Sequence, residues 1–214
     1  MNIAVIPAYN EEKTIREVIT RCKEVDVYPF VVDDGSADHT YEIARDLTDT
    51  FRIFPNQGKG FALNHAFGLI KVCCKADYII IIDADLQFNP YEIPKLLEAL
   101  KDYDYVVGQR DWSQVPLRHY LGNLVWIKTF NFLYGTHLQD TNCGFVAMKS
   151  EVMMKLKVHS GYIVDNDMLI QVIKLGYKVK NVPVSVKYYN TRGVSGIRMV
   201  IGILIFIIIQ RLKR

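Results

Sequence analysis

The sequence lacks the patterns that mark several common classes of protein. Its 214 residues contain no G-x-x-x-x-G-K-[ST] loop and no G-x-G-x-x-G loop, so two frequent phosphate-binding motifs are missing. Only four cysteines occur, with no C-x-x-C pair, which speaks against a zinc site and against a disulfide framework. We therefore expect free thiols, buried or semi-buried, in a reducing compartment.

Excess charge and long apolar runs are also absent. The net charge is +3 and no basic run precedes the last four residues, so we expect no nucleic-acid partner. The uncharged stretch Met199–Ile209 is too short to cross a membrane, because a spanning helix needs roughly 20 residues. No basic segment followed by an apolar one opens the sequence. We therefore expect no cleaved signal peptide, and catalysis on the cytoplasmic face of the membrane.

What is present is the composition of an ordinary globular domain, 50% hydrophobic and 23% charged. Apolar segments alternate with polar turns and helical segments, as in βαβ units of a parallel sheet. The predicted fold class is α/β, a mostly parallel central sheet flanked by helices. We expect strands at 2–6, 28–32, 51–54, 78–82, 105–107, 178–183 and 185–189, and another ending at Met148. We expect helices near 11–23, 39–47, 90–100 and 165–175, and one that follows Gly60 and ends at about Val72.

The apolar segment Tyr78–Ile82 leads directly into Asp83-Ala84-Asp85-Leu86-Gln87. If the extended geometry continued, Asp83, Asp85 and Gln87 would share one face, because alternate residues of a strand point the same way. Two close carboxylates repel each other, and a divalent cation that prefers oxygen ligands, Mg²⁺ or Mn²⁺, relieves that cost. The alternative is that the acids merely end the strand, since Asp is common in turns.

Two other predicted strands also end in polar turns, Pro7–Asn10 and Asp33–Ser36. Right-handed crossovers bring the strand-to-helix turns to one edge of a parallel sheet, and ligands bind outside the carboxyl ends of such strands. We therefore expect these two turns and Asp83–Gln87 to line a single crevice. This convergence strengthens the metal hypothesis.

Several polar residues allow two interpretations each. Lys59, between two glycines, either approaches a phosphate or belongs to a flexible helix start. Asp165 or Asn166 either caps a late helix or places an acid near the sugar or acceptor. Arg110 follows a strand end, which modestly favours a ligand contact over a surface charge. Arg192 lies in a glycine-containing segment and suits a phosphate.

Two apolar helical segments raise the question of a membrane surface. The segment 117–134 is rich in aromatic residues, which fits either core packing or an interfacial helix. The apolar C-terminal segment with its basic tail fits either a last core helix or a peripheral contact with anionic headgroups. We favour the peripheral contact, and divide the chain into a catalytic domain, residues 1–196, and a membrane-associating segment, residues 197–214.

Five short motifs follow one another along the chain, Pro7-Ala8-Tyr9-Asn10-Glu11-Glu12, Val32-Asp33-Asp34-Gly35-Ser36-Ala37-Asp38, Asn56-Gln57-Gly58-Lys59-Gly60, Asp83-Ala84-Asp85-Leu86-Gln87 and Asp140-Thr141-Asn142-Cys143-Gly144-Phe145. In this order they resemble the motifs of glycosyltransferase family 2, inverting enzymes with the GT-A fold, and within it the dolichyl-phosphate mannose synthase group. Each motif is weak alone, but five in sequence make a strong signal, and the resemblance covers nearly the whole chain. It implies a single GT-A (Rossmann-like) domain with a short C-terminal apolar helix, a nucleotide-sugar donor and a polyprenyl (dolichyl) phosphate acceptor.

The resemblance also implies roles for particular residues. Mg²⁺ or Mn²⁺ would be bound by Asp83, Asp85 and Gln87. The nucleotide sugar would be held by Pro7, Ala8, Tyr9, Asn10, Glu11, Asp33, Asp34, Lys59 and Ala84, beside the metal ligands. The catalytic set would comprise Asp83, Asp85, Asp140 and three arginines that contact the diphosphate and the acceptor phosphate, Arg110, Arg118 and Arg192.

The sequence departs from this family's pattern in places. A basic residue usually follows the last Gly-x-Ser, whereas Ser195 is followed by Gly196 and Ile197, and whether Arg198 substitutes is left open. Asp165 or Asp167 stands where the family often has a glutamate-based acid. Two transmembrane helices found in some members are missing.

The expected reaction is a single in-line displacement, in which the lipid phosphate oxygen attacks the anomeric carbon and inverts it. An anionic phosphate needs no strong general base. Alternatives are a family 2 enzyme with a soluble glycan or polysaccharide acceptor and, less favoured, a phosphoacceptor signalling domain. GDP-mannose is the first candidate donor, with UDP-glucose and UDP-N-acetylglucosamine next.

Overall fold

A single β-sheet organises the computed structural model, which describes residues 1–111, 117–158, 163–187 and 197–212. For helical residues 117–122 and 197–201 it describes the backbone only. Within these ranges the sheet has seven strands in the order β3-β2-β1-β4-β6-β5-β7. Their bounds are β1 Asn2–Ala8, β2 Tyr28–Asp33, β3 Thr50–Arg52, β4 Tyr78–Ile81, β5 Tyr105–Arg110, β6 Val146–Lys149 and β7 Val179–Val184.

The sheet is mostly parallel, which confirms the predicted fold class. β6 runs antiparallel to both of its neighbours, β4 and β5, while the other four pairs of neighbours are parallel. From β1 the chain moves outward to β2 and β3, and then returns to the other side of β1 to form β4. The strand order therefore reverses between β1 and β4, where α/β sheets bind ligands.

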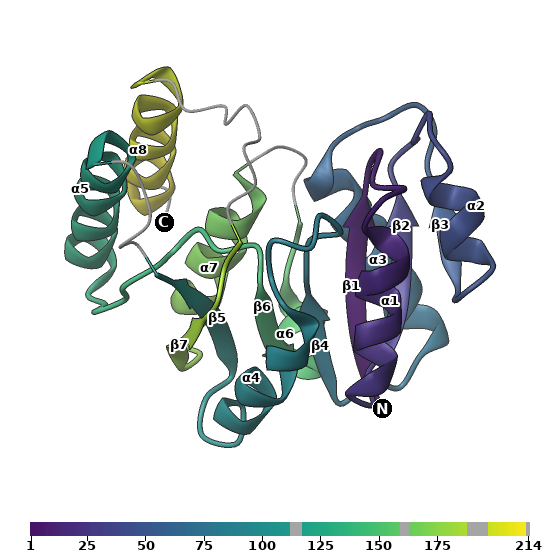
Figure 1. Ribbon diagram of the computed structural model, residues 1–214. Coiled ribbons are helices and arrows are strands. Elements are labelled where there is room, and N and C mark those ends of the chain that lie inside the picture. The colour runs from purple at the N-terminus through teal and green to yellow at the C-terminus, as the bar shows by residue number, and fades with distance from the viewer. Residues whose placement is uncertain (112–116, 159–162, 188–196, 213–214) are drawn as a thin grey trace.

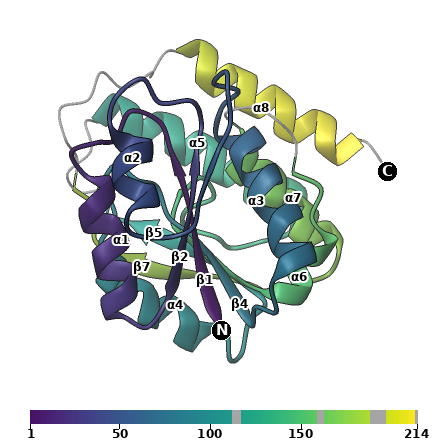
Figure 2. The same ribbon diagram turned by 90° about the vertical axis from the view of Figure 1, so that its right-hand side faces the viewer.

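Helices cover both faces of the sheet (Figures 1 and 2). α1 and α4 lie on one face, and α3, α6 and α7 lie on the other. α5 and α8 pack against each other toward the carboxyl ends of the parallel strands. The bounds are α1 Ile15–Glu24, α2 Thr40–Arg45, α3 Lys59–Cys73, a 3-10 turn at Pro90–Glu92, α4 Ile93–Ala99, α5 Leu117–Tyr134, α6 Ser150–Lys155, α7 Val164–Lys174 and α8 Ile197–Leu212.

The centre of the core is β4, as its unbroken apolar sequence predicts. Ile79, Ile80, Ile81 and Ile82 are completely buried, so both faces of this strand are covered. Burying each such side chain contributes about 1.5–3 kcal/mol relative to leaving it exposed. This packing stabilises β4 and offsets the free energy that it costs to place acidic residues at the end of the strand.

The structure corrects several predicted boundaries. α1 begins at Ile15 rather than at residue 11, because residues 12–14 form a turn instead of regular helix, directly after Asn10 with its positive φ of 57°. No regular strand forms at 185–187, where the pairing is an isolated bridge between Phe88 and Val186, and residues 188–189 lie outside the described ranges. α6 was not predicted.

Of the four free cysteines, two are buried as expected and two are exposed, Cys73 and Cys74.

α8 uses one side to pack on the rest of the protein and leaves the other side open. Ile203 and Ile207 are buried, and the Tyr134 hydroxyl of α5 donates a 3.0 Å hydrogen bond to the Ile207 carbonyl. Ile205 and Ile209 are exposed. Across the described residues, no helix combines the length and apolarity needed to cross a membrane.

This packing predicts unequal effects of truncating two isoleucines of α8. Ile207 is 0% exposed, so Ile207→Ala should lower the free energy of unfolding by about 2–4 kcal/mol, since the lost methyl groups leave a cavity. Ile209 is 44% exposed, and Ile209→Ala should cost less than about 1 kcal/mol. Urea titration of both variants measures the difference, and equal costs would show that α8 does not dock through Ile207.

Candidate functional site

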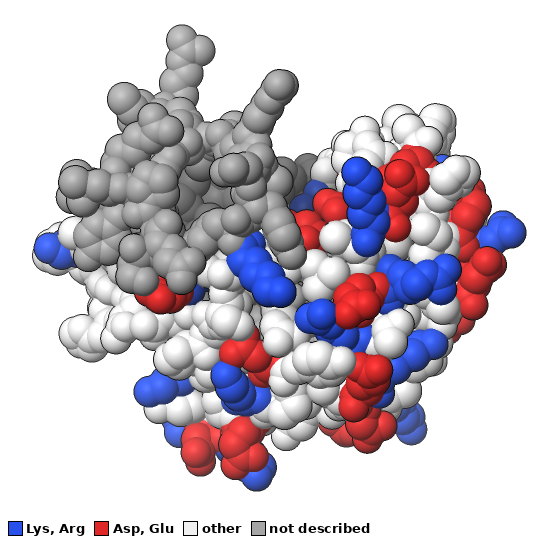
Figure 3. All heavy atoms as spheres, viewed as in Figure 1, with Lys and Arg blue, Asp and Glu red and all other residues white. Residues whose placement is uncertain are grey.

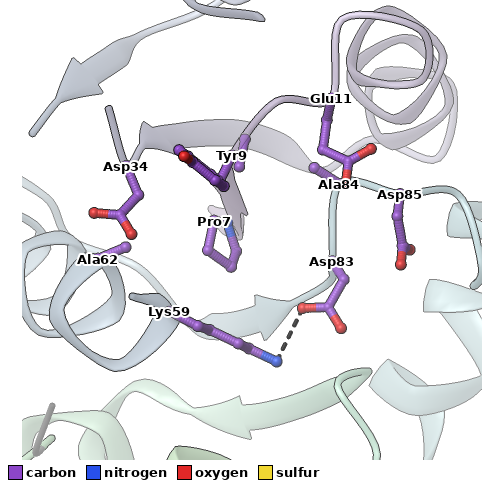
Figure 4. Close-up of a pocket in the computed structure, with 10 residues that line it drawn as sticks. Pro7, Tyr9, Glu11, Asp34, Lys59, Ala62, Asp83, Ala84 and Asp85 are labelled. Atoms are coloured by element: carbon purple, nitrogen blue, oxygen red, sulfur yellow. Dashed lines mark ion pairs between the residues drawn. The ribbon is translucent and has the colours of Figure 1, made fainter. Parts of the chain in front are cut away.

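A pocket of about 300 Å³ opens at the carboxyl ends of β1, β2 and β4, where the strand order reverses. Figure 4 shows side chains from four separate segments around it. The single crevice expected from the sequence is therefore present. The pocket is lined by Pro7, Ala8, Tyr9, Glu11, Asp34, Lys59, Ala62, Asp83, Ala84 and Asp85.

The turn after β1 is held against the turn after β2 by Asn10. The Asn10 backbone N–H donates to the Ser36 hydroxyl at 2.9 Å, and its side-chain oxygen accepts from the Ala37 N–H at 2.8 Å. The left-handed backbone of Asn10 makes both contacts possible at once. Asn10 thus joins the two turns, and it is not among the residues that line the pocket.

The two adjacent aspartates at the end of β2, Asp33 and Asp34, have different contacts. Asp34 lines the pocket, and its carboxylate accepts backbone N–H groups of Gln57 at 2.9 Å and Gly58 at 2.6 Å. It thereby fixes the loop that leads into α3. Asp33 is completely buried away from the pocket and pairs with Arg52 at 3.2 Å. The structure therefore places Asp34, rather than Asp33, where a ligand can reach it.

The chain does not stay extended after β4, contrary to the geometry assumed from the sequence. β4 ends at Ile81, a turn follows at Ala84–Asp85, and Leu86 has a positive φ of 59°. Asp83 and Asp85 nevertheless both line the pocket. Gln87 does not, and its backbone N–H donates to the Asp85 carboxylate at 3.0 Å.

Lys59, the first residue of α3, reaches across the pocket to two acids. Its ammonium lies 2.9 Å from Oδ1 of Asp83 and 3.2 Å from Oδ2 of Asp165 (Figure 4 shows the first contact). Gly144 lies against the other side of Asp83. A Cβ at that position would come within 2.1 Å of Oδ2 of Asp83, so any other residue would displace this carboxylate from its present position.

Burial dominates the electrostatics of the pocket acids. It raises the pKa of Glu11 and of Asp85, and the charge of Asp83 adds to both shifts. Burial also raises the pKa of Asp165, although Lys59 opposes this. For Lys59, burial alone would lower the pKa, but the charges of Asp165 and Asp83 outweigh it and raise the pKa above the usual range. Lys59 is therefore a permanent cation at neutral pH.

A second polar cluster holds Arg110 and Asp140, both predicted to be catalytic. Nε and Nη2 of Arg110 lie 2.8 and 3.0 Å from the two Asp140 oxygens, a bidentate pair. Asp140 is 1% exposed and also accepts the N–H of Asn142 at 3.1 Å. Asn142 in turn accepts from the side chain of Asn166 at 2.8 Å, which connects this cluster to α7.

The predicted site residues thus fall into groups. The pocket brings together Pro7, Ala8, Tyr9, Glu11, Asp34, Lys59, Asp83, Ala84 and Asp85, whereas Asn10, Asp33 and Gln87 do not line it. Arg110 and Asp140 pair with each other in the second cluster. Only the backbone of Arg118 is described, in α5, and Arg192 lies outside the described residues.

Sequence reasoning missed three features of the site. It named Asp165 only as a helix cap or an acid near the sugar, not as the partner of Lys59, and α7 gains no side-chain cap. It gave no role to Arg52, the partner of Asp33, or to Gly144. The glycine within the Asn142-Cys143-Gly144 motif was a usable signal for close backbone approach. The two ion pairs span distant segments, so no local signal existed.

The fold is that of an α/β protein with an acidic pocket where the strand order reverses, and comparison with known proteins identifies its family. Residues 3–157 match the model of Glycosyl transferase family 2. The chain belongs to this family and is a glycosyltransferase. This assignment leaves no support for a phosphoacceptor signalling domain.

The chain is similar to several archaeal proteins over most of its length. An uncharacterised protein of Methanocaldococcus jannaschii is 34% identical over 208 residues, 88% of this chain and 89% of that protein. The UDP-N-acetylglucosamine–dolichyl-phosphate N-acetylglucosaminyltransferase of Methanococcus voltae is 28% identical, covering 98% and 94%. A dolichyl-phosphate hexose transferase of Haloferax volcanii is 27% identical, covering 84% and 80%. These names support the dolichyl-phosphate glycosyltransferase group within the family.

Solved structures share the fold. Glucosyl-3-phosphoglycerate synthase of Mycobacterium tuberculosis, in complex with Mn²⁺, uridine diphosphate and phosphoglyceric acid, superposes with a TM-score of 0.80 at 22% identity. The match covers 100% of this chain and 78% of that one. At this identity the likeness establishes the GT-A fold and nothing further.

The raised pKa of Asp85 predicts how its replacement changes stability. A carboxyl whose pKa is raised by folding makes its full contribution to stability below its unfolded pKa and loses it as the pH rises through its folded pKa. Its ionised form therefore costs stability at neutral pH. Asp85→Asn should therefore raise the Tm of the metal-free protein at pH 7 by a few degrees. The gain should shrink as the pH falls through the pKa of Asp85.

Thermal unfolding in EDTA at several pH values measures these changes in Tm. Asp38→Asn is the control, for which we expect a change in Tm of the opposite direction. Burial would raise the pKa of Asp38, but hydrogen bonds from Thr40 and the Glu12 N–H outweigh it and lower the pKa. Its ionised form therefore stabilises the protein at pH 7, and the variant should lower the Tm there. A lower Tm for Asp85→Asn at pH 7 would contradict the assigned cause.

Proposed function

We propose that this enzyme transfers a hexosyl group from a nucleotide sugar to dolichyl or another polyprenyl phosphate, with inversion and with the help of Mg²⁺ or Mn²⁺. The observation that carries the proposal is the convergence of Asp83 and Asp85 with Asp34 and the turn after β1 in one pocket. Relatives whose names specify dolichyl phosphate support the acceptor.

The acids of the pocket fit a hard divalent cation. Asp85 is mostly buried, and its described hydrogen-bond donor is the neutral N–H of Gln87, so its charge has little compensation. The described residues hold no cluster of three acidic, histidine or cysteine side chains placed to bind a metal. Mg²⁺ typically uses one or two carboxylates and completes its shell with water and substrate phosphates, so the two carboxylates of Asp83 and Asp85 are enough. Asp83 and Asp85 would hold the metal, and Gln87 would need its amide to turn toward them.

A bound cation would neutralise the charge that builds up on the departing nucleoside diphosphate. The chain's own residues then bind and orient. Asp34 and Tyr9 lie on the side of the pocket opposite Asp85, where the nucleoside fits (Figure 4). Glu11 lies beside Asp85 and is a candidate contact for the donor.

The acceptor needs orientation more than activation. A phosphate monoester is already anionic near neutral pH, so holding its oxygen in line with the anomeric carbon supplies most of the catalysis required. Arg110 is preorganised for phosphate by its bidentate pair with Asp140, and we assign Arg118 and Arg192 the same task from the family motifs. Asp140 then acts by fixing Arg110.

Removing the first carboxylate tests this function. Asp83→Ala should abolish Mn²⁺-dependent transfer to a polyprenyl phosphate, with a loss of at least roughly 10²-fold in kcat, because a preorganised charge is removed from the reacting centre. The control is Asp102→Ala, an exposed acid in the turn that follows α4. Radiolabelled transfer with GDP-mannose, UDP-glucose and UDP-N-acetylglucosamine provides the readout. Full activity of Asp83→Ala with its best donor would end the proposal.

A soluble phosphorylated acceptor is the second candidate. The ground for this candidate is that glucosyl-3-phosphoglycerate synthase, which shares the fold, was solved with phosphoglyceric acid, a small soluble phosphate. A soluble glycan or polysaccharide is the related alternative. Competition between polyprenyl phosphate and these soluble acceptors in one assay distinguishes them.

We further assign the exposed side of α5 and α8 to the cytoplasmic surface of a membrane, with residues 197–214 as the attaching segment. Phe132 of α5 and Ile205, Ile209 and Leu212 of α8 are exposed apolar side chains, and Arg211 adds positive charge. α8 lies toward the carboxyl ends of the strands, as the pocket does (Figures 1 and 2). A lipid acceptor would therefore reach the pocket from that side.

The exposed isoleucines of α8 offer a direct test of attachment. The double change Ile205→Gln and Ile209→Gln should weaken binding to vesicles of anionic lipid by roughly tenfold or more, because two apolar side chains no longer insert. Val72→Gln on α3, with 86% exposure in the native protein, is the control and should bind normally. Vesicle flotation measures both, and normal binding of the double variant would contradict attachment through α8.

A further inference from the structure

One ammonium group joins three segments that are far apart in the sequence. Lys59 opens α3, Asp83 follows β4, and Asp165 lies in the first turn of α7. The two contacts measure 2.9 Å to Asp83 and 3.2 Å to Asp165. We call Lys59, Asp83 and Asp165 the ion triad. It carries two negative charges and one positive charge at the wall of the pocket.

The two acids of the ion triad differ in how much they depend on Lys59. The Asp165 side chain is 12% exposed, and its Oδ1 is buried without a hydrogen-bond partner among the described residues. The Asp83 side chain is 32% exposed and faces the pocket. A buried charge that loses its partner costs far more than one open to water. Lys59 can therefore leave Asp83 more easily than it can leave Asp165.

Both members of the Lys59–Asp83 pair lie close to Gly144. Oδ1 of Asp83 contacts Lys59, and a Cβ at Gly144 would lie 2.1 Å from Oδ2 of Asp83 and 3.1 Å from the Lys59 nitrogen. The glycine therefore leaves room for the ion pair at this place. Any other cation that binds Asp83 must compete with the ammonium that already contacts it.

We propose that Lys59 is the resident counter-cation of Asp83, that a divalent cation displaces it, and that Asp165 is the positioning residue that retains the lysine when this happens. The proposal rests on the proposed function, because it takes Asp83 and Asp85 as the place where the metal binds. In the metal-free enzyme Lys59 relieves the repulsion between the pocket acids. Asp165 then sets how strongly Lys59 competes for Asp83.

The ion triad predicts the order of metal affinity among variants. In Asp165→Asn, Lys59 has only Asp83 as its anionic partner, so it competes harder and Mn²⁺ should bind about three- to fivefold more weakly. In the double variant Lys59→Met/Asp165→Asn the competing cation is gone and the net charge is unchanged. Mn²⁺ should then bind about three- to fivefold more tightly than to the native enzyme.

The experiment is a titration of Mn²⁺, followed by electron paramagnetic resonance, with each purified full-length variant and no nucleotide present. If Lys59 instead supports metal binding by holding Asp83 in place, the double variant will bind Mn²⁺ more weakly than the native enzyme. That result, or equal affinity for Mn²⁺, would contradict the proposal that the divalent cation displaces Lys59 from Asp83. Lys75→Met, which removes an exposed lysine just beyond α3, is the matched control and should bind like the native enzyme.

Thermal unfolding in EDTA supplies a second readout. Lys59→Met alone leaves Asp165 buried without its cation and should lower the Tm, and adding Asp165→Asn should recover most of the loss. No recovery would show that Asp165 does not retain the lysine. Failure of the underlying function has a different signature: the native enzyme would bind no Mn²⁺ even with GDP or UDP present, which sinks both proposals together.

Discussion

The structure depends on one electrostatic constraint, the gathering of acidic side chains at the point where the sheet reverses its strand order. Glu11, Asp34, Asp83 and Asp85 meet in a single small pocket. Burial of these acids, and to a smaller extent the repulsion between them, opposes folding, as the raised pKa values of Glu11 and Asp85 show. The buried strand β4 holds Asp83 and Asp85 in place. Backbone N–H groups compensate Asp34, and Lys59 compensates Asp83. Such an arrangement suits a site that receives a cation and a diphosphate together.

The polar contacts around the pocket join the two parts of the chain. Asn10 ties the turn after β1 to the turn after β2, and Asp34 holds the loop before α3. Lys59 then connects this N-terminal part to α7 through Asp165. Farther along, Asn166 reaches Asn142 and so the pair of Arg110 with Asp140. The donor side and the arginine cluster are therefore linked through the first turn of α7.

Acidic and basic side chains are interspersed over the described part of the face shown in Figure 3. The gathering of acids in the pocket is therefore a feature of the pocket and not of this whole face.

Much of the fold could be predicted because its signals are local. Apolar runs such as Tyr78–Ile82, each followed by a polar turn, defined the parallel strands and the edge where they end. The pocket residues followed from that edge and from five family motifs. Details failed where distant segments decide the outcome. Asn10 and Leu86 adopt left-handed conformations that no periodicity reveals. The partners of Asp33 and Lys59, which are Arg52 and Asp165, come from other elements and became visible only when the chain was folded.

The product made by the purified enzyme shows whether it is a metal-dependent polyprenyl-phosphate hexosyltransferase. The enzyme is incubated with polyprenyl phosphate, a panel of nucleotide sugars and Mn²⁺, and the lipid fraction is analysed by mass spectrometry. We expect a polyprenyl monophosphate that carries one hexosyl group from a preferred donor, formed with Mn²⁺ and lost in EDTA. Sugar transfer to a water-soluble acceptor alone, or a lipid product that forms equally well in EDTA, would contradict it.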